Sequence, residues 1–272
     1  MVINMATFGF IGVGNMGGAL AQAVCKRVGG ENVCVSDYSP EKAREFAEAF
    51  GCRATDNAQV AATANFIFLG VKPQVLPGVM ESLAGALRER AEGFVLVTMA
   101  AGIPIASLED MAGAHLPVIR IMPNTPVAVG EGMILYTAND AVGEDELAQF
   151  VSALALAGKT DLIEEELIDA ASVISGCGPA FMYMFLEAMA GAGEALGLDG
   201  EKARAYAQQT MIGAATLAAS SPETLETLRI RVCSPGGSTI EGVKKFDALG
   251  LSDMTMEALS ASYRRTKELG KR

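Results

Sequence analysis

Residues 7–17 read TFGFIGVGNMG, an apolar run followed by Gly12, Gly14 and Gly17 in the pattern GxGxxG. The apolar run predicts a buried strand, and the residues after it predict a helix over 16–28. The first glycine permits a tight turn, the second lets the backbone approach a pyrophosphate, and the third lets the helix pack on the strand. Amides at the start of this helix would hold the anion. The stretch therefore predicts a dinucleotide-binding βαβ unit.

Asp37 follows the next apolar run, VCVS at 33–36, about 20 residues further on, where such folds carry an acidic residue. A carboxylate there accepts a hydrogen bond from a ribose 2′-hydroxyl and repels a 2′-phosphate, which favours NADH over NADPH. Lys42 and Arg44 are close enough in sequence to offset that charge. Two other interpretations stay open: Asp37 caps the helix that contains Pro40, and the glycine turn binds no ligand.

Further apolar runs alternate with helical stretches up to about residue 162. After TFGFIG and VCVSD, the expected strands are FIFLGV, FVLVTMA and PVIRIMP, and the expected helices cover 16–28, 40–50, 75–90 and 104–113. Continuous apolar strands joined by crossover helices are typical of a parallel sheet that is covered on both faces. We therefore predict a doubly wound α/β Rossmann domain over residues 1–162.

Residues 163–272 show only helical spacing and predict an all-α domain. The expected helices cover 166–175, 179–197, 200–219, 222–232 and 238–270. The helix after Pro179 is apolar over much of its circumference, and Gly191 and Gly193 permit a close neighbour. Such a helix is more easily buried between two subunits than within one small domain, so we expect a dimer through this half.

Composition excludes several classes of protein. A formal net charge of −11 argues against a nucleic-acid partner. The apolar uncharged run 170–186 is short and is interrupted by a Gly-Cys-Gly-Pro turn, so we expect no membrane span. The five cysteines are scattered without a CxxC pair, which predicts no metal site and no disulfide framework. The N-terminus shows no secretion signal, and we expect a cytoplasmic protein.

Three turn-like segments, VKPQ at 71–74, MAAG at 99–102 and MPNTP at 122–126, follow predicted strands at the edge where such sheets bind ligands. Two more, SGCGPA at 175–180 and SPGGST at 234–239, lie in the helical half. With these motifs in order over nearly its full length, the chain resembles the pyrroline-5-carboxylate reductase family.

The resemblance implies a Rossmann domain, a helical domain that interlocks with a partner's, and NAD(P)H-dependent reduction of a cyclic imine to proline. NADPH is the cofactor that the family favours, and assembly of homodimers into decamers is a family trait. By similarity, the cofactor contacts would be Ile11, Gly12, Val13, Gly14, Asn15, Met16, Gly17, Asp37, Asn57, Val71, Lys72, Pro73, Ala100 and Ala101.

By the same similarity the imino-acid substrate would lie against the loop 234–239. The implied substrate contacts are Ser234, Gly236, Gly237, Ser238, Thr239 and Asn124, with Glu165 as a weaker candidate. Backbone N–H groups of Gly236, Gly237 and Ser238 suit a carboxylate, and the Thr239 hydroxyl can donate to the imine nitrogen, which makes it the catalytic candidate. The resemblance also implies that this loop serves a site that the other subunit completes.

Local pattern also supports a purely structural interpretation of this loop. Ser238 and Glu241 match the S-x-x-E capping box, in which the serine caps the helix and the glutamate reaches back. Elsewhere, His115 is expected at the surface, and Glu165 lies in an acidic run that is usually a solvated turn.

The chain departs from the family pattern in two places. Cys177 stands where the family usually has serine, and Asp37 stands where NADPH-preferring members have small or basic residues. Two other functions are compatible with a Rossmann domain. A β-hydroxyacid dehydrogenase would carry a lysine after the glycine-rich turn, whereas 178–200 contain none. A nucleotide-sensing protein without turnover would not need the SPGGST segment.

Overall fold

The computed structural model describes residues 6–90 and 93–269. The chain divides into two compact units, the first made of residues 1–177 and 263–272 and the second of 178–262. The sequence predicted a domain boundary after residue 162, where the last strand ends. That boundary stays a prediction. Each unit is described by itself.

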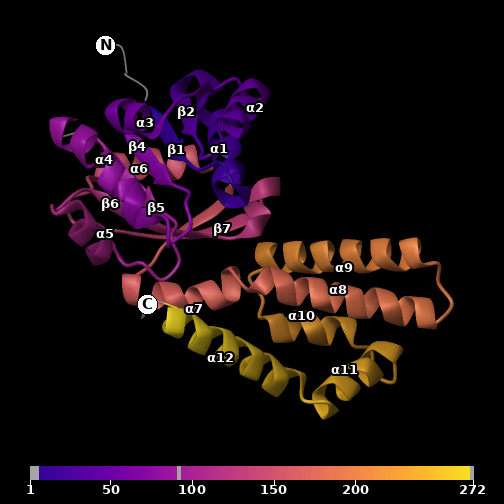
Figure 1. Ribbon diagram of the computed structural model, residues 1–272. Helices are drawn as coiled ribbons and strands as arrows, with labels where there is room; N and C mark the ends of the chain where they lie inside the picture. Colours follow the sequence, from indigo (N-terminus) through magenta and orange to yellow (C-terminus); the bar gives the residue numbers. More distant parts are fainter. Residues whose placement is uncertain (1–5, 91–92, 270–272) are drawn as a thin grey trace. The chain divides into compact units, whose positions relative to one another are not determined.

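The first unit contains an eight-stranded sheet with the order β3-β2-β1-β4-β5-β6-β7-β8 (Figure 1). The strands are β1 (Phe8–Ile11), β2 (Val33–Ser36), β3 (Arg53–Ala54), β4 (Phe66–Leu69), β5 (Val95–Thr98), β6 (Val118–Pro123), β7 (Gly132–Ala138) and β8 (Gly158–Leu162). All five expected strands are present. The strand order reverses between β1 and β4, which is where doubly wound sheets bind dinucleotides.

One edge of the sheet departs from the expected parallel arrangement. Strand β7 pairs antiparallel with β6, and β8 then pairs parallel with β7. The chain returns from β6 through a short 3-10 helix, η2 (Thr125–Val129), rather than through a crossover helix, so the direction of the strand is inverted. Strand β8 reads GKTDL and is partly exposed. Its sequence lacks the apolar run that marks a buried strand, so the sequence did not predict it.

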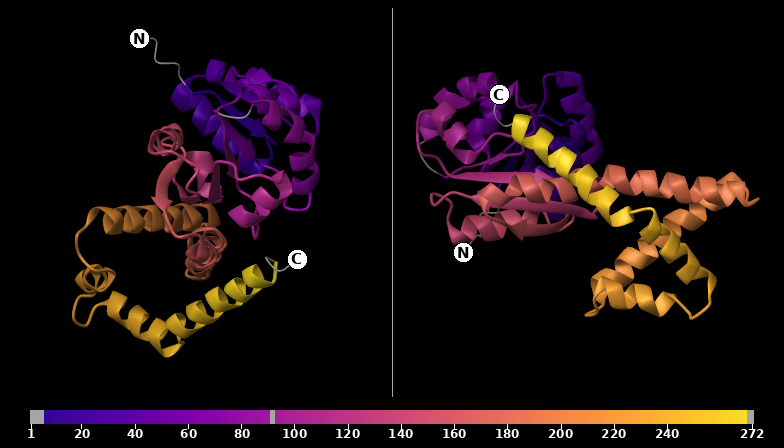
Figure 2. Two further views of the ribbon diagram at one scale, coloured as in Figure 1. Left: turned by 90° about the vertical axis from the view of Figure 1, so that its left-hand side faces the viewer. Right: turned by 90° about the horizontal axis from the view of Figure 1, so that it is seen from below.

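Helices cover both faces of the sheet, as the two further views in Figure 2 also show. One face packs against α1 (Asn15–Val28), α2 (Pro40–Phe50) and α6 (Glu144–Ala153), and the other against α3 (Asn57–Thr63), α4 (Leu76–Arg90) and α5 (Ile105–Ala112). A short 3-10 helix, η1 (Gly30–Asn32), leads into β2. Helices α3 and α6 were not expected from the sequence.

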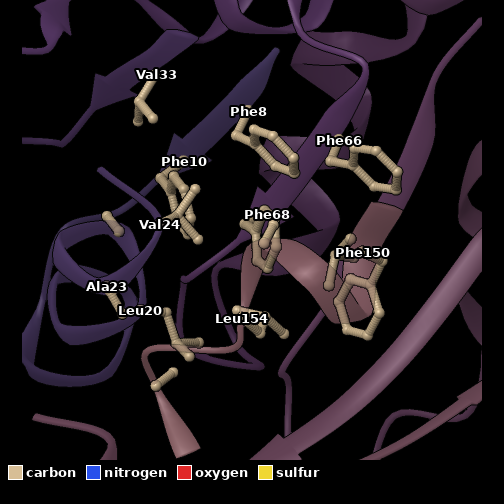
Figure 3. Close-up of a cluster of buried hydrophobic side chains, with 14 of the residues drawn as sticks. Phe8, Phe10, Leu20, Ala23, Val24, Val33, Phe66, Phe68, Phe150 and Leu154 are labelled. Carbon is tan, nitrogen blue, oxygen red and sulfur yellow. The ribbon is translucent and has the colours of Figure 1, made fainter. Parts of the chain in front are cut away.

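Alternating strand residues build the two apolar layers. Phe8 and Phe10 of β1 face one layer together with Phe66 and Phe68 of β4, and their rings stack in pairs (Figure 3). Ile11, which has the opposite parity, contributes to the second layer. Each fully buried phenylalanine contributes about 1.5–3 kcal/mol through its removal from water. This core fixes the sheet edge on which the glycine loop stands.

The remaining helices are α7 (Glu165–Ser175), α8 (Gly178–Ala195), α9 (Gly200–Ser220), α10 (Leu225–Val232), α11 (Ser238–Ala248) and α12 (Leu251–Leu269). The expected single helix over 238–270 is wrong, because it is broken after Leu249. Gly250 has a φ of 73°, a left-handed conformation that a regular helix does not contain. The expected helix over 222–232 begins only at Leu225, where the Thr224 side chain caps it.

Within the second unit, α8 and α9 form a hairpin joined by residues 196–199 (Figure 1). They approach closely at Gly193, where an added Cβ would lie 3.0 Å from that of Ala203. No described residue of α8 is buried, and Tyr183 and Met184 are 58% and 66% exposed. By length and composition alone, the stretch Glu165–Ala195 is apolar enough to cross a membrane, which is weak evidence for a span. The large apolar side chains of α8 are therefore exposed in this chain.

Candidate cofactor and substrate sites

The β1–α1 loop is closely packed by backbone. Gly12 has a φ of 96°, and a Cβ on it would lie 2.7 Å from the Gly70 carbonyl oxygen. A Cβ on Gly17 would lie 2.2 Å from the Gly12 carbonyl oxygen, so both positions require glycine. A Cβ on Gly14, by contrast, would meet nothing within 4 Å. Gly14 is also the N-cap of α1 without a capping side chain, which leaves the first amides open to an anion.

Asp37 is held at the end of β2 by two backbone amides. Its Oδ2 accepts from the Val13 N–H at 2.9 Å, and its Oδ1 accepts from the Ser39 N–H at 3.1 Å. The first bond ties the acidic residue directly to the glycine loop. Ser39, not Asp37, caps α2 by accepting from the Lys42 N–H, so the capping interpretation of Asp37 is wrong. The Lys42 Nζ lies 3.8 Å from the carboxylate.

The other expected cofactor residues follow strands of the same sheet edge. Asn57 begins α3, and its Oδ1 accepts from the buried Ser36 hydroxyl at 2.7 Å. The segment Val71, Lys72 and Pro73 follows β4, and Ala100 and Ala101 follow β5. The carboxyl ends of parallel neighbours β2, β1, β4 and β5 meet at one edge, so the fold brings all of these segments together.

The loop 234–239 contains a tight turn. The Gly237 N–H donates to the Ser234 carbonyl at 3.0 Å, and Gly236 has a φ of 71°. Proline at the second position and a glycine of positive φ at the third are typical of a type II turn. Since the Gly237 N–H closes this turn, its expected role as a carboxylate donor needs correction. The amides of Ser238 and Thr239 lie in the first turn of α11, where no side chain caps the helix.

The expected capping box at Ser238 is wrong. Gly237 occupies the N-cap position, so Ser238 is the first residue of α11, and no side chain caps the helix. Glu241 does not reach back but pairs with the Lys244 Nζ at 2.7 Å. The Pro-Gly-Gly turn shifts the helix start by one residue, which leaves the first amides uncapped. Thr239 stands in the first turn beside them.

Asn124 and Glu165 both make structural hydrogen bonds. The Asn124 side chain is buried, donates to the Ser175 carbonyl and accepts from the Met133 N–H, both at 2.9 Å. The Glu165 Oε1 accepts from the Ile105 N–H at 2.9 Å and from the Arg120 Nη1 at 3.0 Å. Their expected substrate contacts stay predictions, beside these roles in the fold.

The described residues hold no cluster of histidine, cysteine or acidic side chains that could bind a metal ion. His115 is exposed as expected, and it pairs with Glu109 and Asp140. The hydrogen bond with Glu109 is the main cause that raises the pKa of His115 above its usual 6.5. The five cysteines are free. The Cys25 thiol is buried, and its hydrogen bond with Cys52 is the main cause that raises its pKa.

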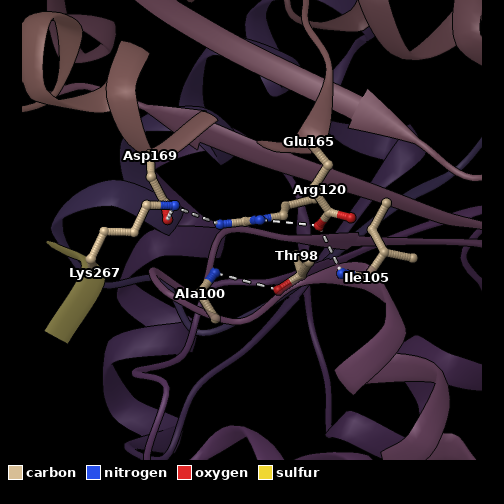
Figure 4. Close-up of polar contacts among 7 residues, drawn as sticks. All are labelled: Thr98, Ala100, Ile105, Arg120, Glu165, Asp169 and Lys267. Carbon is tan, nitrogen blue, oxygen red and sulfur yellow. Dashed lines mark hydrogen bonds and ion pairs between the residues drawn. The ribbon is translucent and has the colours of Figure 1, made fainter. Parts of the chain in front are cut away.

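Sequence reasoning missed Arg120 in β6. Its side chain is only 5% exposed, and it pairs with Glu165 and with Asp169, whose Oδ1 lies 3.4 Å from Nη2 (Figure 4). An arginine inside the apolar run PVIRIMP was the available signal, because a charged residue is almost never fully buried without a partner.

A glycine loop between β1 and α1, an acidic residue after β2 and an apolar helical unit define a class: the dinucleotide-binding oxidoreductases with a helical dimerisation domain. Residues 7–102 match the family described as "NADP oxidoreductase coenzyme F420-dependent". Residues 165–269 match the family described as "Pyrroline-5-carboxylate reductase dimerisation".

Similar proteins cover nearly the whole chain. The pyrroline-5-carboxylate reductase of Pseudomonas aeruginosa is 38% identical over 96% of this chain and 95% of its own length. Among solved structures, a pyrroline-5-carboxylate reductase from Coxiella burnetii is 32% identical, with a TM-score of 0.91 over 98% of this chain and 99% of that one. A Plasmodium falciparum pyrroline carboxylate reductase with NADP bound is 28% identical, with a TM-score of 0.86 over 97% of this chain and 98% of that one.

The chain therefore belongs to the pyrroline-5-carboxylate reductase family, as its motifs indicated. It is an NAD(P)H-dependent oxidoreductase with an N-terminal Rossmann-like domain and a C-terminal helical dimerisation domain.

Proposed function

We propose that the enzyme reduces the C=N bond of 1-pyrroline-5-carboxylate to give L-proline, with the Rossmann edge binding the nicotinamide cofactor and the loop 234–239 binding the substrate. The observation that carries this proposal is a pair of helices, α1 and α11, that both begin at a glycine without a capping side chain. Uncapped first-turn amides bind anions. The two anions to be bound are the cofactor's pyrophosphate and the substrate's carboxylate.

The residues needed for this chemistry are few. A bound nicotinamide supplies a hydride, which adds to the imine carbon, and the nitrogen then takes up one proton. The amides of Ser238 and Thr239 would hold the carboxylate, and the Thr239 hydroxyl would hydrogen-bond the nitrogen and relay the proton from water. Because the nitrogen becomes more basic as the hydride adds, orientation of the substrate is the main contribution asked of the protein.

For the cofactor, we propose that NADPH and NADH are both accepted. The family relation to an NADP-bound enzyme supports NADPH. Asp37 favours NADH, because two amide hydrogen bonds hold its carboxylate where it would repel a 2′-phosphate. Lys42, 3.8 Å away, offsets part of that charge. The balance between the two nucleotides is therefore proposed to depend on residue 37.

For the assembly, we propose a homodimer through the helical unit, with further association of dimers into decamers. Support comes from the dimerisation match and from large apolar side chains that stay exposed in one chain. They include Met182, Tyr183, Met184, Phe185, Met189, Tyr206, Ile212 and Leu217. A second copy would cover this surface, which removes the need for a membrane. We propose a soluble cytoplasmic enzyme without a nucleic-acid partner.

The deciding assay mixes the purified protein with 1-pyrroline-5-carboxylate and either NADPH or NADH and follows the absorbance of the reduced cofactor. We expect oxidation of cofactor matched by formation of proline. If the protein oxidises neither NADPH nor NADH in this assay, the proposal is contradicted. Size measurement in solution at several concentrations checks the assembly, and a monomer at all of them would contradict the dimer.

A further inference from the structure

Among the described residues, Arg120 is the one charged residue that is buried. It lies on β6 beside Thr98 of β5 in the register of the parallel pair, at the carboxyl end of β5. Its side chain is 5% exposed. Desolvating a guanidinium is expensive, and the chain offsets that cost with two carboxylates, Glu165 and Asp169. These are four residues apart on α7 and therefore share one face of that helix.

The network reaches two further elements, α5 and the end of α12 (Figure 4). The Glu165 carboxylate that pairs with Arg120 also accepts from the Ile105 N–H. Ile105 is the first residue of α5, whose N-cap, Pro104, offers no side-chain cap. Glu165 therefore caps α5 from another element, and Arg120 holds Glu165 in place. Asp169 pairs in addition with the Lys267 Nζ at 3.0 Å, near the end of α12.

The backbone held in this way is the segment 99–104 between β5 and α5. At its start, the Ala100 N–H donates to the Thr98 Oγ1 at 3.3 Å (Figure 4). At its end, Glu165 holds Ile105. Gly102 and Pro104 line a cavity of about 350 Å³ that Arg120 and Glu165 also line. The segment is therefore fixed at both ends, and the second fixed point depends on Arg120.

The position of this segment in the sheet relates it to one half of the cofactor. A dinucleotide lies across the reversal between β1 and β4, with the adenosine ribose at the acidic residue after β2. Asp37 marks that adenosine side. The other half of the molecule, which carries the nicotinamide, then lies on the side of β4 and β5, where Ala100 and Ala101 follow β5.

We propose that Arg120 is a positioning residue for hydride transfer: through Glu165 it holds the segment 99–104 against the nicotinamide half of the cofactor. This inference rests on the proposed function. In this proposal Arg120 acts through Glu165, with which it pairs, rather than by contact with the cofactor. Its planar fork serves two carboxylates at once, which a lysine ammonium cannot reproduce.

The test compares two ligands by isothermal titration calorimetry, NADPH and 2′-phospho-ADP-ribose, which lacks the nicotinamide. For Arg120→Lys we expect the affinity for NADPH to fall about tenfold, kcat to fall by up to about 100-fold, and the affinity for the fragment to stay unchanged. Glu165→Gln keeps an oxygen acceptor for Ile105 but loses the charge, so we expect the same pattern with a smaller loss. This second variant decides the question if Arg120→Lys does not fold.

Arg90 provides the matched control. Its guanidinium donates to the carbonyls of Ala61, Ala64 and Gly93, which precede β4 and β5 at the opposite edge of the same sheet. Arg90→Lys should lower the melting temperature without separating the two ligands. An equal loss of affinity for both ligands in Arg120→Lys, or the same separation in Arg90→Lys, would overturn the proposal. Because the titrations contain no imine, they stay informative if the reductase assay itself fails.

Discussion

The chain contains two glycine loops that lead into helices, one in each unit, and they are built differently. Both place a positive-φ glycine before the helix, Gly12 at 96° and Gly236 at 71°, and both use a glycine N-cap without a side-chain cap. In the first loop, added Cβ atoms on Gly12 and Gly17 would collide with backbone oxygens. In the second, a Cβ on Gly236 would meet nothing within 4 Å.

The difference shows what each loop needs from its surroundings. The Rossmann loop is packed against its own sheet and is preformed in a single chain. The loop 234–239 is largely exposed, and the hydrogen bond from the Gly237 N–H to the Ser234 carbonyl closes its turn. Substitutions in the first loop should therefore affect folding and binding together, whereas those in the second should affect catalysis with little effect on folding.

Gly17→Ala is expected to have the largest effect. Its Cβ would lie 2.2 Å from a backbone oxygen, so helix α1 must move away from the loop. We expect a loss of about 1–3 kcal/mol or more in the free energy of unfolding, together with loss of measurable cofactor binding. Gly14→Ala is the matched control, since the added Cβ meets only open space. This variant should keep the melting temperature of the wild type and lose only affinity for the cofactor. Equal melting temperatures of the two variants would contradict this account.

Thr239→Ala should come next and should separate catalysis from folding. Loss of the hydroxyl that serves the imine nitrogen is expected to lower kcat about 100-fold or more, while the dissociation constant for NADPH changes little. Thr239→Ser restores a hydroxyl and should recover much of the rate. Steady-state kinetics on the three proteins measures this, and an unchanged rate in the alanine variant would remove Thr239 from the mechanism.

Asp37→Ser tests the charge beside the first loop. Removing a fixed carboxylate relieves repulsion of a 2′-phosphate, so the ratio of kcat/KM for NADPH to that for NADH should rise about tenfold or more. The rate constant with saturating cofactor should stay close to that of the wild type. A ratio that does not move would mean that Lys42 already neutralises Asp37.

Gly236→Ala should have a smaller and more local effect. A left-handed backbone costs a residue with a Cβ about 1–2 kcal/mol, but no neighbour opposes the added atom. We expect KM for the imine to rise while the melting temperature of the Rossmann unit is retained. Differential scanning calorimetry and kinetics together check this, and a global loss of stability would show that the second loop is packed after all.

His115→Asn should have the smallest effect and should leave both loops unchanged. A raised pKa in the folded state means that the histidine stabilises the fold below pH 6.5, and that this contribution disappears as the pH rises through the folded pKa. The variant should melt slightly below the wild type at pH 5.5 and together with it at pH 8.5. The opposite order would contradict the pairing of His115 with Glu109 and Asp140.

Much of the fold was accessible from sequence. The five apolar strands and the glycine pattern predicted the doubly wound sheet, because a buried parallel strand is recognisable from its own residues. The polar strand β8 and the antiparallel strand β7 were missed, since an edge strand and a return without a crossover helix lack that signal. The break at Gly250 was missed although a glycine between two leucines marked the position.

The candidate sites divide in the same way. Motif and family resemblance indicated where the cofactor and substrate segments lie. They could not show that Asp37 bonds the Val13 amide, 24 residues away, or that Glu165 bonds the Ile105 amide, 60 residues away. The sequence did not predict the role of Arg120, because its partners are carboxylates of α7 that are distant from it in the chain.

By itself, the sequence determined the Rossmann class, the helical second half and the family. Those properties follow from hydrophobic period, from turn residues and from motifs, which all act between near neighbours in the chain. Only the tertiary structure decided that Gly237 rather than Ser238 occupies the N-cap position of α11, that Ser39 rather than Asp37 caps α2, and that Glu165 pairs with Arg120. A hydrogen-bonding side chain takes the partner that packing brings within about 3 Å, and packing depends on the whole chain.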